Sequence, residues 1–370
     1  MTPPPAPPMT RLAWLGVGIV VVVLLLAPVI FSDFFWGIML TKALWLGLVA
    51  MSLIFLSSYG GMVSLAQVGL FGIAGFMLAN LAHADGGLPV ELSPWLAVVL
   101  AIAIAVVVGL VFGAISARSE GIYFLMITLA LGVIVFYFFS QVTQFGGFGG
   151  VNNVELPGLV GDPVVDRAPL YYISLAVAVI AFVALLYLAK TPFGLTLQGV
   201  RDDPTRMRAL GFNVALHRTL AFGAAALVAA LAGILFVWYN RRIDPASIRL
   251  GFTIDVLVVA VIGGLYRLHG AWVGALAFVL IDNYSRRWTP DIGPVLGPDR
   301  FNTLIGLIFL IIILVSPGGL VGAWEQARDR IRSTFRGRPA RAGPDERAGP
   351  AAEEAAGKPG SAAADRPGVP

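Results

Sequence analysis

The chain has 370 residues, of which 58% are hydrophobic and only 12% are charged, and its mean hydropathy is +0.85. Soluble domains carry about 25% charged residues, so this composition excludes an ordinary soluble domain and indicates a membrane protein. In such a protein the formal net charge of +4 and the pI near 9.5 are typical of basic cytosolic loops rather than of a nucleic-acid-binding surface.

Apolar runs follow one another along most of the chain. Residues 1–10 are rich in proline and are expected to be disordered. The first apolar run, 13–31, is long enough to cross a bilayer core, which needs about 20 residues. A cleaved signal peptide is the alternative, but the run is too long and is followed by aromatic residues instead of a small-residue cleavage site. The further runs are 36–57, 61–81, 94–116, 121–140, 169–189, 218–239, 252–284 and 301–315.

The distribution of Lys and Arg predicts the orientation of these runs. Basic residues concentrate in 190–218 and in the tail, which the positive-inside rule places in the cytosol. The run 252–284 is interrupted by GGLYRLHG, and counting it as two short crossings returns the tail to the cytosol. We therefore expect an all-α integral membrane protein with about ten transmembrane segments and cytosolic N- and C-termini. Arg241, Arg242 and Arg249 then lie outside, against the rule.

Ten segments can be divided into two repeats of five. Because five is odd, the second repeat would have inverted topology, a common plan of transporters. GGMVSLAQVGLFGIAGF, residues 60–76, and GGLYRLHGAWVGALAF, residues 263–278, fall in comparable places and share a Gly-Gly start. The sequence thus predicts a polytopic domain over 11–322, with a disordered basic tail over 323–370.

One polar helix is predicted between the apolar runs. Asp203 is a suitable N-cap and Pro204 suits the first helical position. Gly211 can take the left-handed conformation that ends a helix, and Phe212 can pack back on the last turn. A helix of about two turns is too short to be stable alone, so the bundle or a partner must hold it. The local pattern alone favours a simple connector between two spans.

The longer segment around this helix carries a resemblance. TPFGLTLQGVRDDPTRMRALGFNVALHRTLAFGAAALVAALAGILF, residues 191–236, resembles the cytoplasmic coupling loop of ABC-transporter permeases, more narrowly the M-type subunit of the branched-chain amino-acid family. GIYFLMITLALG, residues 121–132, GGFGGVNNVELPG, residues 146–158, and IIILVSPGGLVG, residues 311–322, also resemble ordered motifs of that family. The resemblance covers roughly 36–322.

The resemblance implies a permease subunit of an ABC importer in the bacterial cytoplasmic membrane, moving branched-chain or related hydrophobic amino acids. It implies that the loop 190–217 receives force from separate cytosolic ATP-binding subunits. It also implies a second permease subunit, usually forming a heterodimer, and an extracytoplasmic substrate-binding protein. The residues implied in coupling to the ATPase are Gly194, Arg201, Asp202, Asp203, Arg206, Ala209, Gly211 and Asn213.

A second set of residues is a candidate for the substrate path, because small and polar residues within a span can line a cavity. The same small residues also favour close helix packing, which is the commoner use. Gln67 is the most informative member, since a buried amide needs a hydrogen-bond partner. The candidates are Ser64, Gln67, Gly69, Gly72, Thr128 and Gly132.

Other functions are weaker candidates. The chain has no cysteine, no cluster of metal-ligand type, no Gly-x4-Gly-Lys-Ser/Thr phosphate loop and no nucleophile beside a base, so we expect no metal, no cofactor and no enzyme. An ion-gradient-driven secondary transporter of small polar solutes is the alternative; it usually needs a carboxylate inside a span. Asp255 and Asp282 lie near the ends of apolar runs. Within the ABC class, import of urea, amides or aromatic acids stays open.

Overall fold

The computed structural model describes residues 22–82, 92–161, 163 and 166–288, together with Gly306, Gly319 and Gly322. All of them belong to one compact unit, Met1–Glu325. The predicted N-terminus 1–10, the loop 83–91, the span 301–315 apart from Gly306, and the tail 323–370 lie outside the described residues, as do the first nine residues of the span 13–31.

Helices account for nearly all of the regular structure in the described part of the chain, which confirms the all-α prediction there; a single isolated bridge pairs Val151 with Ile243. The elements are α2 (Ala27–Ile30), the π-helical turn η1 (Phe35–Leu40), α3 (Thr41–Gly60), α4 (Gln67–Leu81), α5 (Pro94–Ser116), α6 (Gly121–Gln141), the 3-10 turns η2 (Thr143–Phe145) and η3 (Gly147–Gly149), α7 (Ala168–Lys190), α8 (Pro192–Asp202), α9 (Pro204–Ala209), α10 (Val214–Asn240), the 3-10 turn η4 (Pro245–Ile248), α11 (Leu250–Gly263) and α12 (Gly270–Trp288).

Five of the described helical segments are long and apolar enough to cross a membrane: Phe35–Gly60, Pro94–Ser116, Gly121–Gln141, Ala168–Lys190 and Val214–Asn240. Three shorter apolar helices accompany them, Gln67–Leu81, Leu250–Gly263 and Gly270–Asn283. Three expectations stay predictions: the number of about ten membrane crossings, the inverted repeat, and the cytosolic position of the termini.

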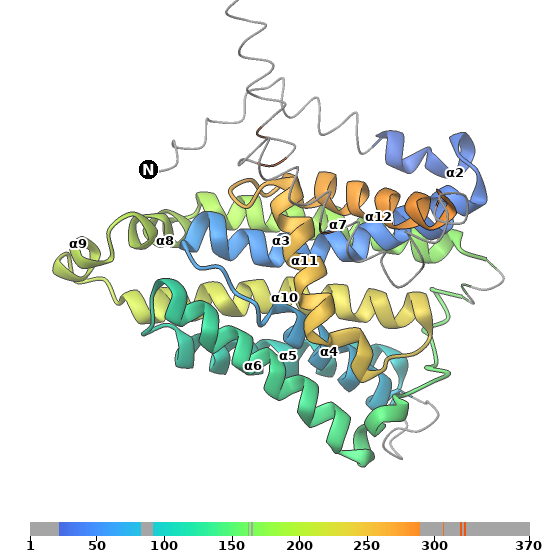
Figure 1. The fold of residues 1–370 in the computed structure, drawn as a ribbon, viewed down its shortest axis with the longest axis horizontal. Coiled ribbons are helices and arrows are strands. Elements are labelled where there is room, and N and C mark those ends of the chain that lie inside the picture. The colour runs from blue at the N-terminus through green and yellow to red at the C-terminus, as the bar shows by residue number, and fades with distance from the viewer. Residues whose placement is uncertain are drawn as a thin grey trace, which may run out of the picture. The chain divides into compact units, whose positions relative to one another are not determined.

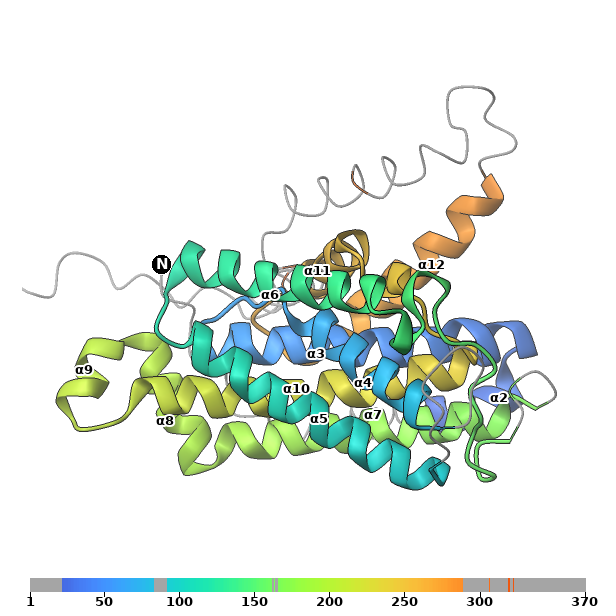
Figure 2. The same ribbon diagram turned by 90° about the horizontal axis from the view of Figure 1, so that it is seen from below.

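The central helices are α3 and α10, which run through the middle of the unit in both views (Figures 1 and 2). They contact each other and most of the other long helices. The outer helices α5, α6 and α7 instead expose large apolar side chains such as Val99, Ile122 and Ile180. Exposed apolar surface on that scale suits contact with lipid rather than with water.

The predicted span 61–81 is helical over a shorter range than the sequence suggested. Gly61 adopts φ +67 and ends α3, and α4 begins only at Gln67. The residues between them form an irregular segment, which we call the α3–α4 junction (residues 61–66). Apolar periodicity does not reveal this break, because the junction is as apolar as the helices beside it.

The apolar run 252–284 does form two helices, α11 and α12, as the GGLYRLHG interruption predicted. Gly263 and Gly270 face each other so closely that a Cβ on either would collide with the other's carbonyl. Gly274 similarly lies against the backbone of Val259. The glycines therefore let the two helix backbones approach each other directly.

Candidate functional site

Three N-caps of the same kind build the coupling segment (residues 190–217). The side chains of Thr191, Asp203 and Asn213 accept hydrogen bonds from the backbone N–H three residues later, at 3.3, 2.9 and 3.0 Å. They begin α8, α9 and α10, respectively. The predicted helix from Asp203 is thus confirmed. Helix α8 was not predicted, although Thr191-Pro192 is the same kind of start signal as Asp203-Pro204.

The end of α9 is the predicted glycine turn. Gly211 has φ +88. The amide of Gly211 donates to the carbonyl of Arg208 at 3.0 Å, and the amide of Phe212 donates to that of Met207 at 3.1 Å. These two bonds close a Schellman motif, which satisfies carbonyls that the helix end leaves free. Met207 also contacts α8 at Gly199, so α9 packs back on α8.

Helix α8 is fixed tightly to the end of α7. Leu197 and Val200 are fully buried. Gly194 lies so close to Leu188 and Ala189 that a Cβ there would overlap their backbone, and Gln198 Nε2 donates to the carbonyl of Ala189 at 3.0 Å. Gly194, predicted as a coupling residue, therefore has a direct steric role in this turn.

Arg201 points into the bundle, against the end of α3. Its guanidinium donates to the backbone carbonyl of Ser58, in the last turn of α3, and its side-chain carbons cover Gly61. Asp202 accepts from the same guanidinium at 2.8 Å. A cation at a helix C-terminus is favourable because the free carbonyls there carry partial negative charge. Arg201 thus joins the coupling segment to the α3–α4 junction.

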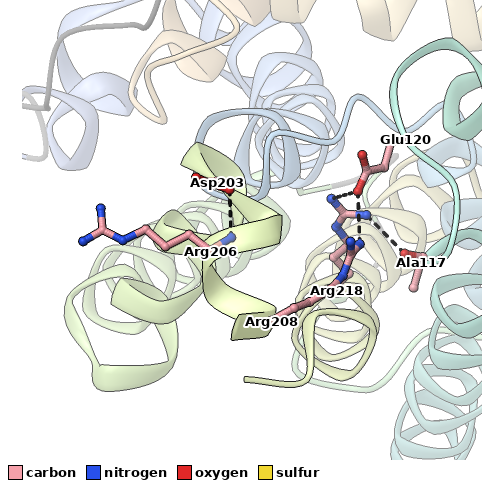
Figure 3. Close-up of polar contacts among 6 residues, drawn as sticks. All are labelled: Ala117, Glu120, Asp203, Arg206, Arg208 and Arg218. Carbon is pink, nitrogen blue, oxygen red and sulfur yellow. Dashed lines mark hydrogen bonds and ion pairs between the residues drawn. The ribbon is translucent and has the colours of Figure 1, made fainter. Parts of the chain in front are cut away.

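A second arginine, directly after the coupling segment, joins the start of α10 to the end of α5, and sequence reasoning missed it. Arg218, at the start of α10, is only 7% exposed; it donates to the carbonyl of Ala117 at 3.2 Å and to Glu120 at 3.1 Å. Glu120 also faces Arg208 of α9 at 3.5 Å. Figure 3 shows both arginines converging on Glu120, while Arg206 extends away. A lone arginine inside an apolar run was the signal that could have found this contact.

A cleft of about 480 Å³ opens beside this network. It lies between the end of α5 and the α9–α10 turn, and its lining includes Arg118, Arg208 and Phe212. Arg206 and Leu210 of the same segment are also exposed. The coupling segment therefore combines an inner side anchored by Arg201 and Arg218 with an outer side that is basic and partly apolar.

Five of the six substrate-path candidates come together where the α3–α4 junction crosses α6. The hydroxyl of Thr128 accepts from the amide of Leu65 at 3.2 Å. Gly69 and Gly132 face each other, so that a Cβ on Gly69 would lie 3.4 Å from the Cα of Gly132. This approach agrees with the helix-packing alternative for the two glycines.

Ser64 and Gln67 lie in the same region, and both are completely buried. Gln67 Nε2 donates to Ser64 Oγ at 3.5 Å, but Gln67 Oε1 has no hydrogen-bond partner among the described residues. Gly72 is separate, because it packs against Ile248 of η4. The start of α4, directly after the junction, thus holds a buried acceptor that no described residue satisfies.

Comparison with known proteins places these features in one family. The model of the family "branched-chain amino acid transport system / permease component" matches residues 37–314. The chain belongs to this permease family. The match includes the α3–α4 junction, the coupling segment and α10.

Individual relatives of this permease-family chain are distant. It is 23% identical to the high-affinity branched-chain amino acid permease protein LivM of Salmonella typhimurium, over 70% of this chain but only 64% of that protein. It is 26% identical to a probable LivM of Methanocaldococcus jannaschii, over 71% of this chain and 80% of the relative. The guanosine ABC transporter permease protein NupQ of Bacillus subtilis is 28% identical, over 62% of this chain and 75% of that protein. No solved structure matches.

Proposed function

We propose that this chain is the membrane-spanning permease subunit of an ABC importer in the bacterial cytoplasmic membrane. The observation that carries the proposal is the anchoring of the capped coupling segment at two helix ends. Arg201 of α8 binds the end of α3, and Arg218, which directly follows the segment in α10, binds the end of α5. In this proposal residues 190–217 and both termini are cytosolic. Separate ATP-binding subunits dock on the outer side of α9 and displace it.

The anchors give that displacement a path into the membrane domain. Arg201 contacts the last turn of α3 directly before the α3–α4 junction. Movement of α8 and α9 therefore acts on the segment that holds Ser64 and Gln67, the candidates for contact with substrate. Arg206, Asp203 and the cleft beside Arg208 form the face on which an ATP-binding subunit docks. A basic, partly apolar face suits a partner groove with acidic side chains.

The substrate in this proposal is a branched-chain or related hydrophobic amino acid. Relatives named as branched-chain amino acid permeases support it. A nucleoside is the alternative that the guanosine permease relative supports. The partners are a second permease subunit forming a heterodimer and an extracytoplasmic substrate-binding protein.

The test is reconstitution of the chain with the products of its genomic neighbours in liposomes. We expect ATP hydrolysis to rise when substrate is added. We also expect uptake into the liposome lumen to require ATP on the luminal side, which corresponds to the cytosol. Uptake driven by a proton or sodium gradient without any ATPase subunit would refute the proposal. Arg201→Glu is expected to abolish uptake because a carboxylate would face the carbonyls of α3. Arg167→Glu makes the same change on an exposed side chain just before α7, at the other end of that helix from residues 190–217, and should leave uptake in place.

A further inference from the structure

The cleft between the end of α5 and the α9–α10 turn has two basic side chains in its lining, those of Arg118 and Arg208. Its volume of about 480 Å³ lies within the range of about 300–1,000 Å³ that small-molecule sites usually have. Val214 and Ala215, in the first turn of α10, also line it. The first amides of a helix have no acceptor within the helix and favour anions. The cleft therefore has the charge that complements an anionic group.

Glu120 is the acidic side chain that faces these arginines, and it is already engaged. Its carboxylate lies 3.1 Å from buried Arg218 and 3.5 Å from Arg208, as Figure 3 shows. The side chains of Arg208 and Glu120 are both more than half exposed, so their pairing contributes little. Arg118 makes no ion pair and no hydrogen bond with the described residues. An anion in the cleft would thus meet one arginine without a partner and a second that is only weakly held.

An apolar stripe on α5 leads to Arg118. Val107, Val111 and Ile115 are each more than half exposed and follow one another at intervals of four residues. Arg118 comes three residues after Ile115, and the residue that caps α5 keeps helical dihedral angles, so all four side chains lie on one face. An exposed apolar face on a membrane helix contacts acyl chains. Arg118 then lies at the depth of the lipid headgroups, where an exposed aromatic residue such as Tyr123 of α6 is also typical.

We propose that the cleft binds the headgroup of an anionic phospholipid of the cytosolic leaflet. The phosphate accepts hydrogen bonds from Arg118 and Arg208, and an acyl chain follows the apolar stripe of α5. Arginine suits a phosphate because its planar guanidinium donates two parallel hydrogen bonds. The inference takes from the proposed function the cytosolic position of residues 190–217. It adds the lipid to the face on which an ATP-binding subunit docks.

The apolar stripe favours a lipid over other anions. A free phosphate ion would use the two arginines and leave Val107, Val111 and Ile115 without a ligand contact. An acidic side chain of a partner protein would likewise use only the charged part of the site. A phospholipid covers both parts, because its charged headgroup is joined to apolar chains.

The test is native mass spectrometry of the full chain in detergent, which counts bound lipids and gives their Kd. The probes are phosphatidylglycerol, phosphatidylcholine with the same acyl chains, whose headgroup has no net charge, and inorganic phosphate. Arg118→Gln is the informative variant, since this side chain has no partner among the described residues to lose. Arg206→Gln is the matched control, because Arg206 is exposed in the same basic region, does not line the cleft and extends away from Glu120 (Figure 3).

The expected changes in Kd follow from the charges. A basic residue beside an anionic lipid strengthens binding about fivefold. Because the two lipid headgroups differ by one charge, the unmodified chain should bind one phosphatidylglycerol about fivefold more tightly than phosphatidylcholine. Arg118→Gln should weaken that binding about fivefold, and Arg118→Gln combined with Arg208→Gln about 25-fold. Arg206→Gln should keep the Kd of the unmodified chain.

Four results would overturn the inference. An unchanged Kd in Arg118→Gln would show that the headgroup does not contact the cleft. Equal weakening in Arg118→Gln and Arg206→Gln would show a diffuse attraction to the whole basic region. Displacement of phosphatidylglycerol by an equal concentration of inorganic phosphate would assign the cleft to a free anion. Release of the lipid when ATP-binding subunits are added would assign it to an acidic side chain of that partner. The lipid titrations themselves need no ATP, so failure of the importer proposal appears separately, in the liposome uptake assay.

Discussion

The turn at Gly211 gives the most direct test of the coupling segment. Its φ of +88 lies in the left-handed region, and no atom lies within 4 Å of the position a Cβ would occupy. A side chain there meets no clash, so its cost is conformational, about 1–2 kcal/mol, with valine at the upper end because it is β-branched. The two hydrogen bonds that close the turn contribute about 1 kcal/mol each. Gly211→Val therefore removes most of what holds the end of α9.

If the free energy of opening the C-terminal end of α9 falls by about 1.4 kcal/mol, the population of molecules in which this end is open rises tenfold. Hydrogen exchange of residues 207–213 in lipid nanodiscs should be faster in Gly211→Val by about that factor. ATP-dependent uptake should be lost while membrane insertion is retained. Gly211→Asn is the matched control, because asparagine tolerates the left-handed region. Wild-type exchange and uptake in Gly211→Val would show that the segment is only a connector.

Two further changes test contacts at opposite ends of α10. Glu120→Gln removes the shared negative charge and leaves the buried Arg218 guanidinium without its ion pair, although the amide oxygen can still accept a hydrogen bond. Because Glu120 is half exposed, we expect the free energy of unfolding to fall by about 1–2 kcal/mol, with a lower Tm and fewer substrate molecules transported per ATP hydrolysed. An unchanged Tm would contradict this. Burial raises the pKa of Asp244, but hydrogen bonds from Arg242 and Ser247 outweigh it and hold that pKa below its usual value. Its support for η4 should thus be complete above about pH 4 and lost as the pH falls through the lower folded pKa. The protection of the Ser247 amide, which is its exchange rate relative to the intrinsic rate at the same pH, measures this support, and Asp244→Asn should make that protection independent of pH.

Local sequence signals predicted those parts of the site that local geometry builds. Asp203-Pro204 and Gly211 define both ends of α9 because capping depends on residues only a few positions apart. The break before α4 was missed, since the junction is apolar and its irregular backbone depends on Gly61 and on the hydroxyl of Thr128, 63 residues from its partner amide. Pairing of Lys42 with Asp282 spans 240 residues, and no spacing rule connects them.

In the proposed mechanism two anchors have a purpose that one would not serve, and the contacts around α6 give the reason. Through Arg201 it touches the end of α3, and the α3–α4 junction follows directly. Through Arg208 it touches Glu120, the residue before α6, and Thr128 lies about two turns further along that helix. These two chains of contacts meet at a single hydrogen bond, from the amide of Leu65 to the hydroxyl of Thr128. If a displacement of α9 moved only one of these two series of contacts, it would strain that hydrogen bond. If it moved both, the junction and α6 would move together. With two anchors, the junction and α6 can move as one body, and the buried Gln67 acceptor moves with them.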